Sequence, residues 1–167
     1  RTIEKPIIAA VNGVAAGAGA NIALACDIVV ATENASFIQA FSKIGLVPDS
    51  AGTFFLPRLI GFQKASALML SGDKVSANQA EQMGMIFKVF TEENFQDEVS
   101  KLAVTLAQMP TKALGLTKRL LNQSMNNELG QQLAMESDLQ IEASSSNDYN
   151  EGVTAFVEKR KPEFKGN

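Results

Sequence analysis

Three elements follow one another in residues 5–31, "KPIIAAVNGVAAGAGANIALACDIVVA". The first, residues 5–13, is apolar, opens with a proline and closes with Asn-Gly, which predicts a short buried strand. Small residues then lead into a helical pattern that ends at Asp27, and Ile28 to Ala31 predict another strand. A strand, a helix and a strand in this order indicate an α/β protein.

The rest of the chain extends this alternation and then changes to helices alone. A strand is expected at residues 36–39, two short helices that each end at a glycine at 50–61 and 62–72, and a strand at 85–90. Ser76 and Gln79 have the spacing of a capping box. Further helices are predicted at 94–108, 111–125, about 128–143 and 148–159, the last with Asp148 as its cap. The sequence therefore predicts an α/β part over residues 1–90 and a helical part over residues 91–167.

Composition limits the class of protein. The chain has 167 residues, of which 46% are hydrophobic and 20% charged, as in a globular domain with a real core. A net charge of −3 argues against nucleic acid as the main partner. No apolar run is long enough to cross a bilayer and no signal peptide is visible, so we expect no membrane partner and a cytoplasmic location. Because the chain opens without Met and runs straight into a strand, we also expect an N-terminal part to be missing.

Two absences exclude several chemistries. There is no histidine, so neither a Ser-His-Asp nor a Cys-His unit can form within this chain. A single cysteine, Cys26, can form neither an internal disulfide nor a structural zinc site, and its apolar neighbours predict a small buried side chain. We expect no metal. Acid–base chemistry is left to Asp, Glu, Lys or the single tyrosine, Tyr149.

The glycine-rich segment at residues 13–27 is not a nucleotide loop. A dinucleotide fingerprint that uses Gly17 and Gly19 would need a third glycine at Ile22, and no Lys-Ser/Thr pair follows that would make a phosphate loop. Such a turn does let backbone N–H groups approach a ligand, for example a carbonyl oxygen that becomes an enolate. Close packing of a helix on a sheet also favours Gly and Ala, and on this motif alone packing is the favoured interpretation.

One carboxylate, Asp49, stands in an almost uncharged stretch, "GLVPDSAGTFFLPRLIG" at residues 45–61. An aspartate before a helix is most often an N-cap, whereas an acid among apolar side chains can also transfer protons. Ser50 beside it can cap the helix equally well. The residues alone leave both roles open.

Residues 5–53 as a whole resemble the enoyl-CoA hydratase/isomerase (crotonase) family. The family pattern runs from "AAVNG" through a glycine-rich turn to "ACDI" and on to "F…GL.P..GGT", and the likeness continues through "LPRLIG", "SANQAEQMGMIFKV" and "EGVTAFVEKRKPEF". The most similar subgroup is that of the ring-epoxide isomerases of phenylacetate degradation, which act on 1,2-epoxyphenylacetyl-CoA. The resemblance implies a crotonase-like ββα spiral, of which this chain is the C-terminal two thirds. Residues 1–90 would be part of the spiral core, and residues 91–167 a helical, trimer-forming layer.

The resemblance also implies an oxyanion site. The family binds acyl-CoA thioesters and holds an enolate with two backbone N–H groups, one of which falls on Ala18, between Gly17 and Gly19. The other belongs to the part absent here, so this chain alone is expected to be inactive. The two catalytic glutamates of the hydratases would fall at Asn21 and Phe41, which together with Gly17 and Gly19 are expected to line the substrate pocket. Neither Asn21 nor Phe41 can take a proton from water, which argues against a hydratase.

Asp49 falls where isomerases of the family carry a catalytic carboxylate, and we therefore predict that Asp49 is the catalytic acid–base residue. One carboxylate can remove a proton and return it elsewhere while the oxyanion site holds the enolate. We expect it to be buried among Phe37, Phe41, Phe54 and Phe55. The predicted function is an acyl-CoA isomerase that shifts a double bond or rearranges a ring epoxide; the alternatives are an enoyl-CoA hydratase and a non-catalytic CoA-binding or assembly protein. No cofactor is expected, since coenzyme A is part of the substrate.

The last segment, "FVEKRKPEF" at residues 156–164, allows two interpretations. By composition it is a solvated helix end whose cations suit the helix dipole. The resemblance implies instead that Phe156 and Lys159 contact the CoA of a neighbouring subunit, in a homotrimer or a dimer of trimers.

Overall fold

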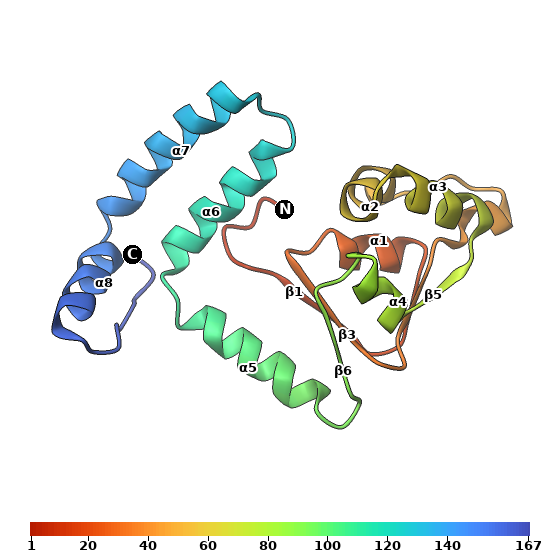
Figure 1. Ribbon diagram of the computed structural model, residues 1–167, viewed down its shortest axis with the longest axis horizontal. Helices are drawn as coiled ribbons and strands as arrows, with labels where there is room; N and C mark the ends of the chain where they lie inside the picture. Colours follow the sequence, from red (N-terminus) through yellow and green to blue (C-terminus); the bar gives the residue numbers. More distant parts are fainter. The chain divides into compact units, whose positions relative to one another are not determined.

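The computed structural model describes residues 1–167, which form two compact units (Figure 1). One unit is Ile7–Ser100; the other combines Arg1–Pro6 with Lys101–Asn167. The division falls inside one long helix, α5 (Phe95–Ala107). The predicted division of roles at residue 90 stays a prediction.

The Ile7–Ser100 unit alternates short strands with short helices. In chain order its elements are β1 (Ile8–Val11), β2 (Val14–Ala16), α1 (Ala18–Leu24), β3 (Ile28–Thr32), β4 (Ser36–Ile38), the 3-10 helix η1 (Ala40–Ile44), α2 (Gly52–Ile60), α3 (Phe62–Ser71), β5 (Lys74–Ser76), α4 (Ala77–Gln82) and β6 (Lys88–Phe90). The α/β prediction is confirmed. The sequence prediction missed β2, β5 and η1, which are too short to show a periodic pattern of hydrophobicity.

The strands form two sheets of three strands each, in the orders β1-β3-β6 and β2-β4-β5. All pairs are parallel except β4 with β5. Two residues, Asn12 and Gly13, separate β1 from β2 and carry the chain from the first sheet to the second. As a result β2 ends directly before the glycine-rich turn, next to β4, with Ala16 opposite Ile38.

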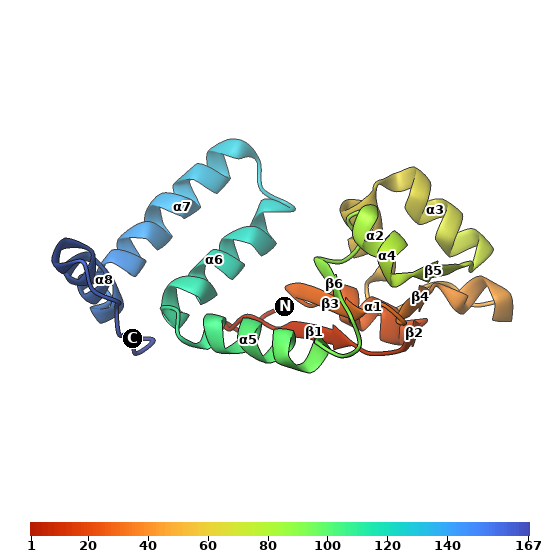
Figure 2. The same ribbon diagram turned by 60° about the horizontal axis from the view of Figure 1, so that its bottom comes forward.

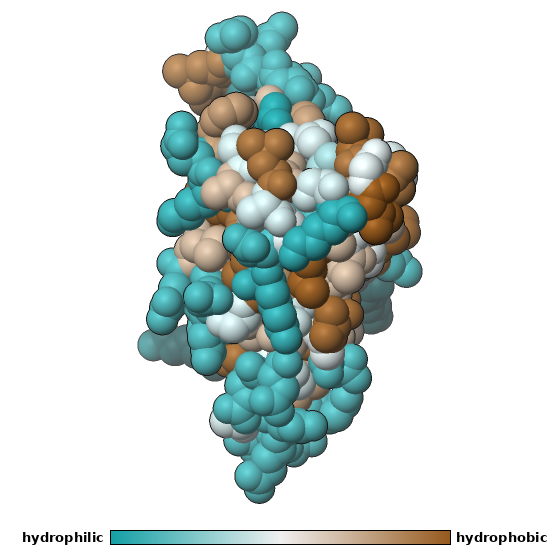
Figure 3. All heavy atoms as spheres, turned by 90° about the vertical axis from the view of Figure 1, so that its right-hand side faces the viewer, coloured by the Kyte–Doolittle hydropathy of each residue, from teal (hydrophilic) through white to brown (hydrophobic).

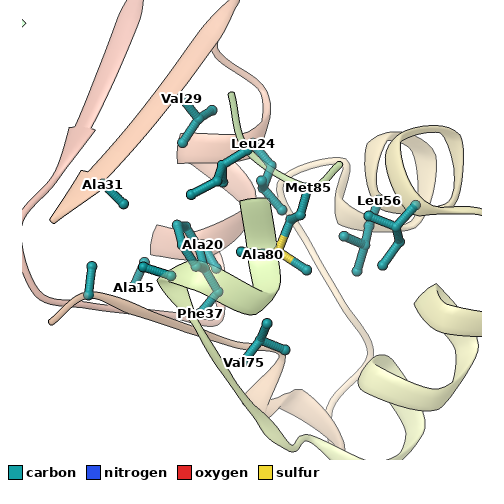
Figure 4. Packing of buried hydrophobic residues seen from close by; sticks show 14 of the residues in the cluster. Ala15, Ala20, Leu24, Val29, Ala31, Phe37, Leu56, Val75, Ala80 and Met85 are labelled. Carbon is teal, nitrogen blue, oxygen red and sulfur yellow. The ribbon is translucent and has the colours of Figure 1, made fainter. Parts of the chain in front are cut away.

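Small residues allow the helices of this unit to pack tightly against the sheets. Ala20 of α1 and Ala77 and Ala80 of α4 are fully buried, and Figure 4 shows Ala20 and Ala80 among Leu24, Phe37 and Met85. Leu56 of α2 and Val75 of β5 complete the same hydrophobic core. The packing interpretation of the glycine-rich segment is therefore correct for the inner face of α1. The one cysteine, Cys26, is expected from the sequence to be a small buried side chain but is only partly buried.

The second unit consists of helices. After α5 come α6 (Thr111–Ser124), α7 (Leu129–Ser144) and α8 (Asn147–Glu158), and α6 and α7 lie side by side in Figures 1 and 2. Residues 1–6 pack on α6: the backbone carbonyl of Glu4 lies 2.7 Å from where a Cβ on Gly115 would stand. None of the helices is both long and apolar enough to span a membrane.

The cap predicted for α8 is wrong. Ser146, not Asp148, is the N-cap, and its hydroxyl accepts the N–H of Tyr149 at 3.1 Å. The buried carboxylate of Asp148 instead accepts the backbone N–H groups of Lys165, at 2.7 Å, and Gly166, at 2.8 Å. Asp148 therefore fastens the C-terminal tail back onto α8, a contact between residues too far apart in sequence for a local pattern to show.

Candidate active site

The turn between β2 and α1 presents a backbone donor beside open space. Gly17 has φ 53° and ψ −123°, a conformation that disfavours any side chain, and its N–H donates to the carbonyl of Ile38 at 2.8 Å. Ala18 is the first residue of α1, so its N–H has no acceptor within the helix. No atom lies within 4 Å of where a Cβ on Gly19 would stand. The Ala18 N–H is therefore left without an acceptor inside the helix, and its role as an oxyanion donor stays a prediction.

The side chain of Phe41 packs beneath Gly17 of this turn. Its buried ring lies 3.5 Å from the position that a Cβ on Gly17 would occupy. A Cβ at position 17 would be in ordinary van der Waals contact with the ring, so the requirement for glycine here comes from the backbone conformation. The Phe41 side chain offers apolar surface and no group that can transfer a proton.

Asn21 connects this turn to the segment that carries Asp49. Its side chain is 0% exposed; its Nδ2 donates to the backbone carbonyl of Asp49 at 2.9 Å, and its Oδ1 accepts from Nε2 of Gln39 at 2.8 Å. Both ends of the amide are thus hydrogen-bonded within the protein, and the side chain is closed off from solvent. The sequence analysis missed Gln39, because only the fold brings the end of β4 next to α1.

Asp49 does not cap α2. The N-cap of that helix is Ala51, and no side chain makes a capping hydrogen bond there. The backbone carbonyl of Asp49 accepts the N–H of Gly52 at 2.9 Å as well as the Asn21 amide, so the peptide is held from two sides. Its carboxylate makes no hydrogen bond or ion pair within the chain and is exposed. Asp49 is therefore not buried within these 167 residues, contrary to expectation. It does not serve as a helix cap either.

Apolar side chains lie on both sides of Asp49 in the sequence. Before it, Ile44, Leu46 and Val47 are all exposed. After it, the rings of Phe54 and Phe55 meet edge to face, with their centroids 5.1 Å apart. Figure 3 views the molecule from the side on which α2 and α3 lie in Figure 1, and hydrophobic groups gather on this face. Of the four predicted aromatic walls, Phe37 and Phe41 are buried and Phe54 and Phe55 half-buried.

The two residues predicted to touch a neighbour's CoA lie at the end of α8. Phe156 is 85% exposed and contributes to the lining of a cavity of about 450 Å³ among α6, α7, α8 and the tail. Lys159 ends the helix in a left-handed conformation, φ 57°, and has no ion-pair partner. Arg160, in contrast, is paired with Glu151 and Glu158. Lys159 is therefore a cation available to an outside anion.

A comparison with known families decides where the chain belongs. The family model described as enoyl-CoA hydratase/isomerase matches residues 1–167, the whole chain. The chain belongs to the enoyl-CoA hydratase/isomerase family. The predicted resemblance is thus confirmed.

Individual members of the family give the degree of similarity. The chain is 50% identical over 164 residues to a 1,2-epoxyphenylacetyl-CoA isomerase of Escherichia coli, covering 98% of this chain and 63% of the relative. It is 40% identical over 166 residues to a 2,3-dehydroadipyl-CoA hydratase of Escherichia coli, covering 99% of this chain and 65% of the relative. The chain therefore spans a little under two thirds of the length of these relatives.

Solved structures confirm the crotonase-like fold. An enoyl-CoA hydratase from Polaromonas sp. JS666 superposes with a TM-score of 0.93 at 39% identity, over 98% of this chain and 64% of that one. An enoyl-CoA hydratase from Bacillus anthracis superposes with a TM-score of 0.95 at 33% identity, over 99% of this chain and 64% of that one. Family membership makes this an enzyme fold, but the family includes both isomerases and hydratases, so the reaction has to be argued from the residues.

Proposed function

We propose that the full-length protein is an acyl-CoA isomerase in which Asp49 carries the proton. The observation that supports this most is the state of Asp49: its carboxylate caps nothing and pairs with nothing, while its peptide is held against α1. A carboxylate kept unpaired on a fixed backbone is suited to proton transfer, because it is not neutralised by a partner and its position is set in advance.

In the proposed reaction, Asp49 removes a proton from the carbon alpha or gamma to the thioester carbonyl. The electron pair moves toward the carbonyl oxygen, which becomes an enolate oxygen facing the N–H of Ala18. Asp49 then returns the proton to the other carbon, and the double bond has shifted with no net gain or loss of atoms. A second oxyanion donor from outside these 167 residues is part of the proposal, since removing one such donor typically lowers the rate by roughly 10²–10³.

The substrate proposed is an acyl-CoA thioester, with coenzyme A as part of the substrate and no further cofactor. The 50% identity to a relative named 1,2-epoxyphenylacetyl-CoA isomerase supports a ring-epoxide acyl group as the natural substrate. Opening an epoxide also needs proton transfer beside the thioester, for which one carboxylate and one oxyanion site are again the minimum.

Enoyl-CoA hydratase is the second candidate, favoured by relatives such as the 2,3-dehydroadipyl-CoA hydratase. Two features of the structure count against it. At Asn21 the side chain is an amide whose oxygen and nitrogen are both hydrogen-bonded inside the protein, and at Phe41 it is a buried ring. Neither can activate water, so hydration would have to proceed with Asp49 as its single acid–base group.

We also propose that the protein assembles as a homotrimer or a dimer of trimers, in which α8 of one subunit reaches the CoA of the next. The exposed Phe156 would pack on the nucleotide end of CoA and Lys159 would face its phosphates. This agrees with the number of exposed large apolar side chains on α7 and α8, which a lone helical layer would leave in water; they are Leu129, Leu133, Ile141, Tyr149, Val153, Phe156 and Val157.

The test compares two reactions of the full-length protein. We expect conversion of a 3-enoyl-CoA into the 2-enoyl-CoA to be readily measured, and hydration of crotonyl-CoA to be very slow. A hydration kcat/KM above about 10⁶ M⁻¹s⁻¹, a value typical of an efficient enzyme, would replace the isomerase with a hydratase. Failure of both reactions, and of the rearrangement of a ring-epoxide acyl-CoA, with a properly assembled protein would favour the non-catalytic CoA-binding alternative.

A further inference from the structure

Two buried amide side chains stand behind Asp49. Asn21 of α1 is 0% exposed, and Gln39, the residue between β4 and η1, is 4% exposed. Gln39 Nε2 donates to Asn21 Oδ1 at 2.8 Å, and Asn21 Nδ2 donates to the Asp49 carbonyl at 2.9 Å. The two bonds form a chain from Gln39 through Asn21 to the peptide of Asp49.

The direction of this chain is fixed by its last acceptor. A backbone carbonyl only accepts, so Asn21 must turn its NH₂ group toward Asp49 and its oxygen toward Gln39. Gln39 must then present its own NH₂ group to Asn21. Its oxygen, Oε1, is left buried with no hydrogen-bond partner. A buried acceptor without a partner lowers the free energy of unfolding, so this orientation of the Gln39 amide is destabilising by itself.

A neighbouring glycine, Gly52, leaves room for the hydrogen bonds that run from Gln39 through Asn21 to Asp49. A Cβ on Gly52, the first residue of α2, would lie 2.3 Å from Asn21 Nδ2, which no real side chain tolerates. With a glycine there, the Asn21 amide passes close to the start of α2 and reaches Asp49. It makes the only side-chain hydrogen bond to residues 48–51. The segment is otherwise exposed, and Ser50 and Ala51 in it are both left-handed.

We propose that Gln39 is a positioning residue for the isomerisation: acting through Asn21, it keeps the peptide of Asp49, and with it the carboxylate, at one place relative to the Ala18 N–H. The inference rests on the proposed function of Asp49. A displacement of about 1 Å can lower the rate of such a reaction by up to about 10²-fold, so holding a backbone in place has a direct kinetic effect. In this account the amide of Asn21 positions the acid rather than a water.

The main variant is Gln39→Leu in the full-length protein, which keeps the volume of the side chain but removes the donor. Its matched control is Ser36→Ala, three residues earlier, in β4, because Ser36 is as buried, its hydroxyl has no partner, and it takes no part in the hydrogen bonds from Gln39 to Asp49. We expect Gln39→Leu to lower the isomerisation kcat by at least about tenfold with KM changed by less than about threefold, since acid placement and not substrate binding is disturbed. Ser36→Ala is expected to keep the wild-type kcat.

A double-variant cycle separates positioning from general damage. If Gln39 acts through Asp49, then adding Gln39→Leu to Asp49→Asn lowers the residual rate by less than about twofold, whereas structural damage lowers both backgrounds by the same factor. Should Gln39→Leu not fold, Gln39→Glu has the same shape and donates to Asn21 only when protonated. Its kcat relative to wild type is then expected to rise as the pH is lowered from 8 to 5, with the melting temperatures followed in parallel.

The outcomes distinguish this inference from the proposed function. Wild-type activity in Asp49→Asn overturns the function and the inference together. A large loss in Asp49→Asn with Gln39→Leu within threefold of wild type, or with an equal loss in both backgrounds, overturns the inference alone. If the kcat of Gln39→Glu relative to wild type does not change between pH 8 and pH 5, the inference alone is likewise overturned.

Discussion

At the scale of single residues, the backbone just after Asp49 is strained. Ser50 has φ 48° and Ala51 φ 60°, both in the left-handed region that disfavours side chains with a Cβ. The family pattern has a glycine at the place of Ala51, and this chain keeps an alanine there. Such strain beside a proposed catalytic acid is tolerated only where the surroundings hold the segment in place, as Asn21 and Gly52 do here.

Ala51→Gly should therefore stabilise the protein. Removing the left-handed alanine relieves about 1 kcal/mol of strain, against which the extra freedom of glycine in the unfolded chain is the smaller effect. The matched control is Ala67→Gly on the exposed face of α3, which should destabilise by about 1 kcal/mol because the backbone there is helical. Urea unfolding of both variants gives the sign directly, and a destabilised Ala51→Gly would contradict the assignment of strain.

The sequence could predict Asp49 but not its surroundings. Its place in the family pattern identified it, and the lack of histidine left few competitors for acid–base work. That it does not cap α2 follows from the backbone angles of Ala51, and no residue pattern shows those in advance. The link from Gln39 through Asn21 joins three separate segments, so it becomes visible only once β4, α1 and the Asp49 turn are placed in space.

At the scale of elements, α2 is held by one side that faces the core. Leu56 is fully buried among the core residues (Figure 4). Leu59, almost one turn later, is 42% exposed. Leu56→Ala should cost about 2–5 kcal/mol of the free energy of unfolding, because it removes buried methyl groups and leaves a cavity. Leu59→Ala on the same helix should cost less than about 1 kcal/mol. Equal losses for both leucines, measured by chemical unfolding, would show that α2 does not pack as described.

An ion pair between Arg160 and Glu151 stabilises the end of α8. Glu151 receives two hydrogen bonds from the guanidinium of Arg160, at 2.7 and 2.8 Å, and one from the backbone N–H of Glu163 at 2.8 Å. The bond from Arg160, followed by that from Glu163, lowers the pKa of Glu151 from 4.5 to about 2. The charged form is thus favoured in the folded chain, and Glu151 links α8 to the C-terminal tail.

The sign of the pH effect follows from this lowered pKa. The pair contributes stability above pH 4.5, and that contribution is lost as the pH falls toward about 2, where Glu151 is protonated in the folded chain as well. NMR titration of the Glu151 carboxyl should give a pKa near 2 in the wild type, moving toward 4.5 in Arg160→Gln. The same pKa in both proteins would mean that Arg160 does not hold the carboxylate. High salt should weaken the effect, since the pair lies near the surface.

Long periodic elements could be predicted from the sequence, and short ones could not. The four helices after Thr91 lie within two residues of their predicted bounds, because each has several turns of amphipathic pattern. β2 and β5 have three residues each, and their existence depends on pairing with β4 rather than on their own composition. The cap of α8 was misplaced for a related reason: the serines at 144–146 and Asp148 are all good caps, and only the fold selects Ser146.

At the scale of the whole molecule, the property to measure is the number of subunits in the assembled protein. The apolar side chains exposed on α7 and α8 predict burial against other subunits, in a trimer or a dimer of trimers. Sedimentation velocity of the full-length protein at micromolar concentration should show that species. A stable monomer would contradict the proposed assembly and would remove the basis for a CoA contact by Phe156 and Lys159.

The central claim is that Asp49 transfers the proton, and Asp49→Asn in the full-length protein tests it most directly. Asparagine keeps the size and the backbone contacts of Asp49 but cannot act as a base. The measurement is exchange of the alpha or gamma protons of the acyl-CoA with deuterated solvent, alongside the melting temperature. We predict that exchange falls by at least about 10²-fold while the melting temperature changes by less than a few degrees. Exchange at the wild-type rate in Asp49→Asn would contradict the account and leave the chain without a catalytic acid.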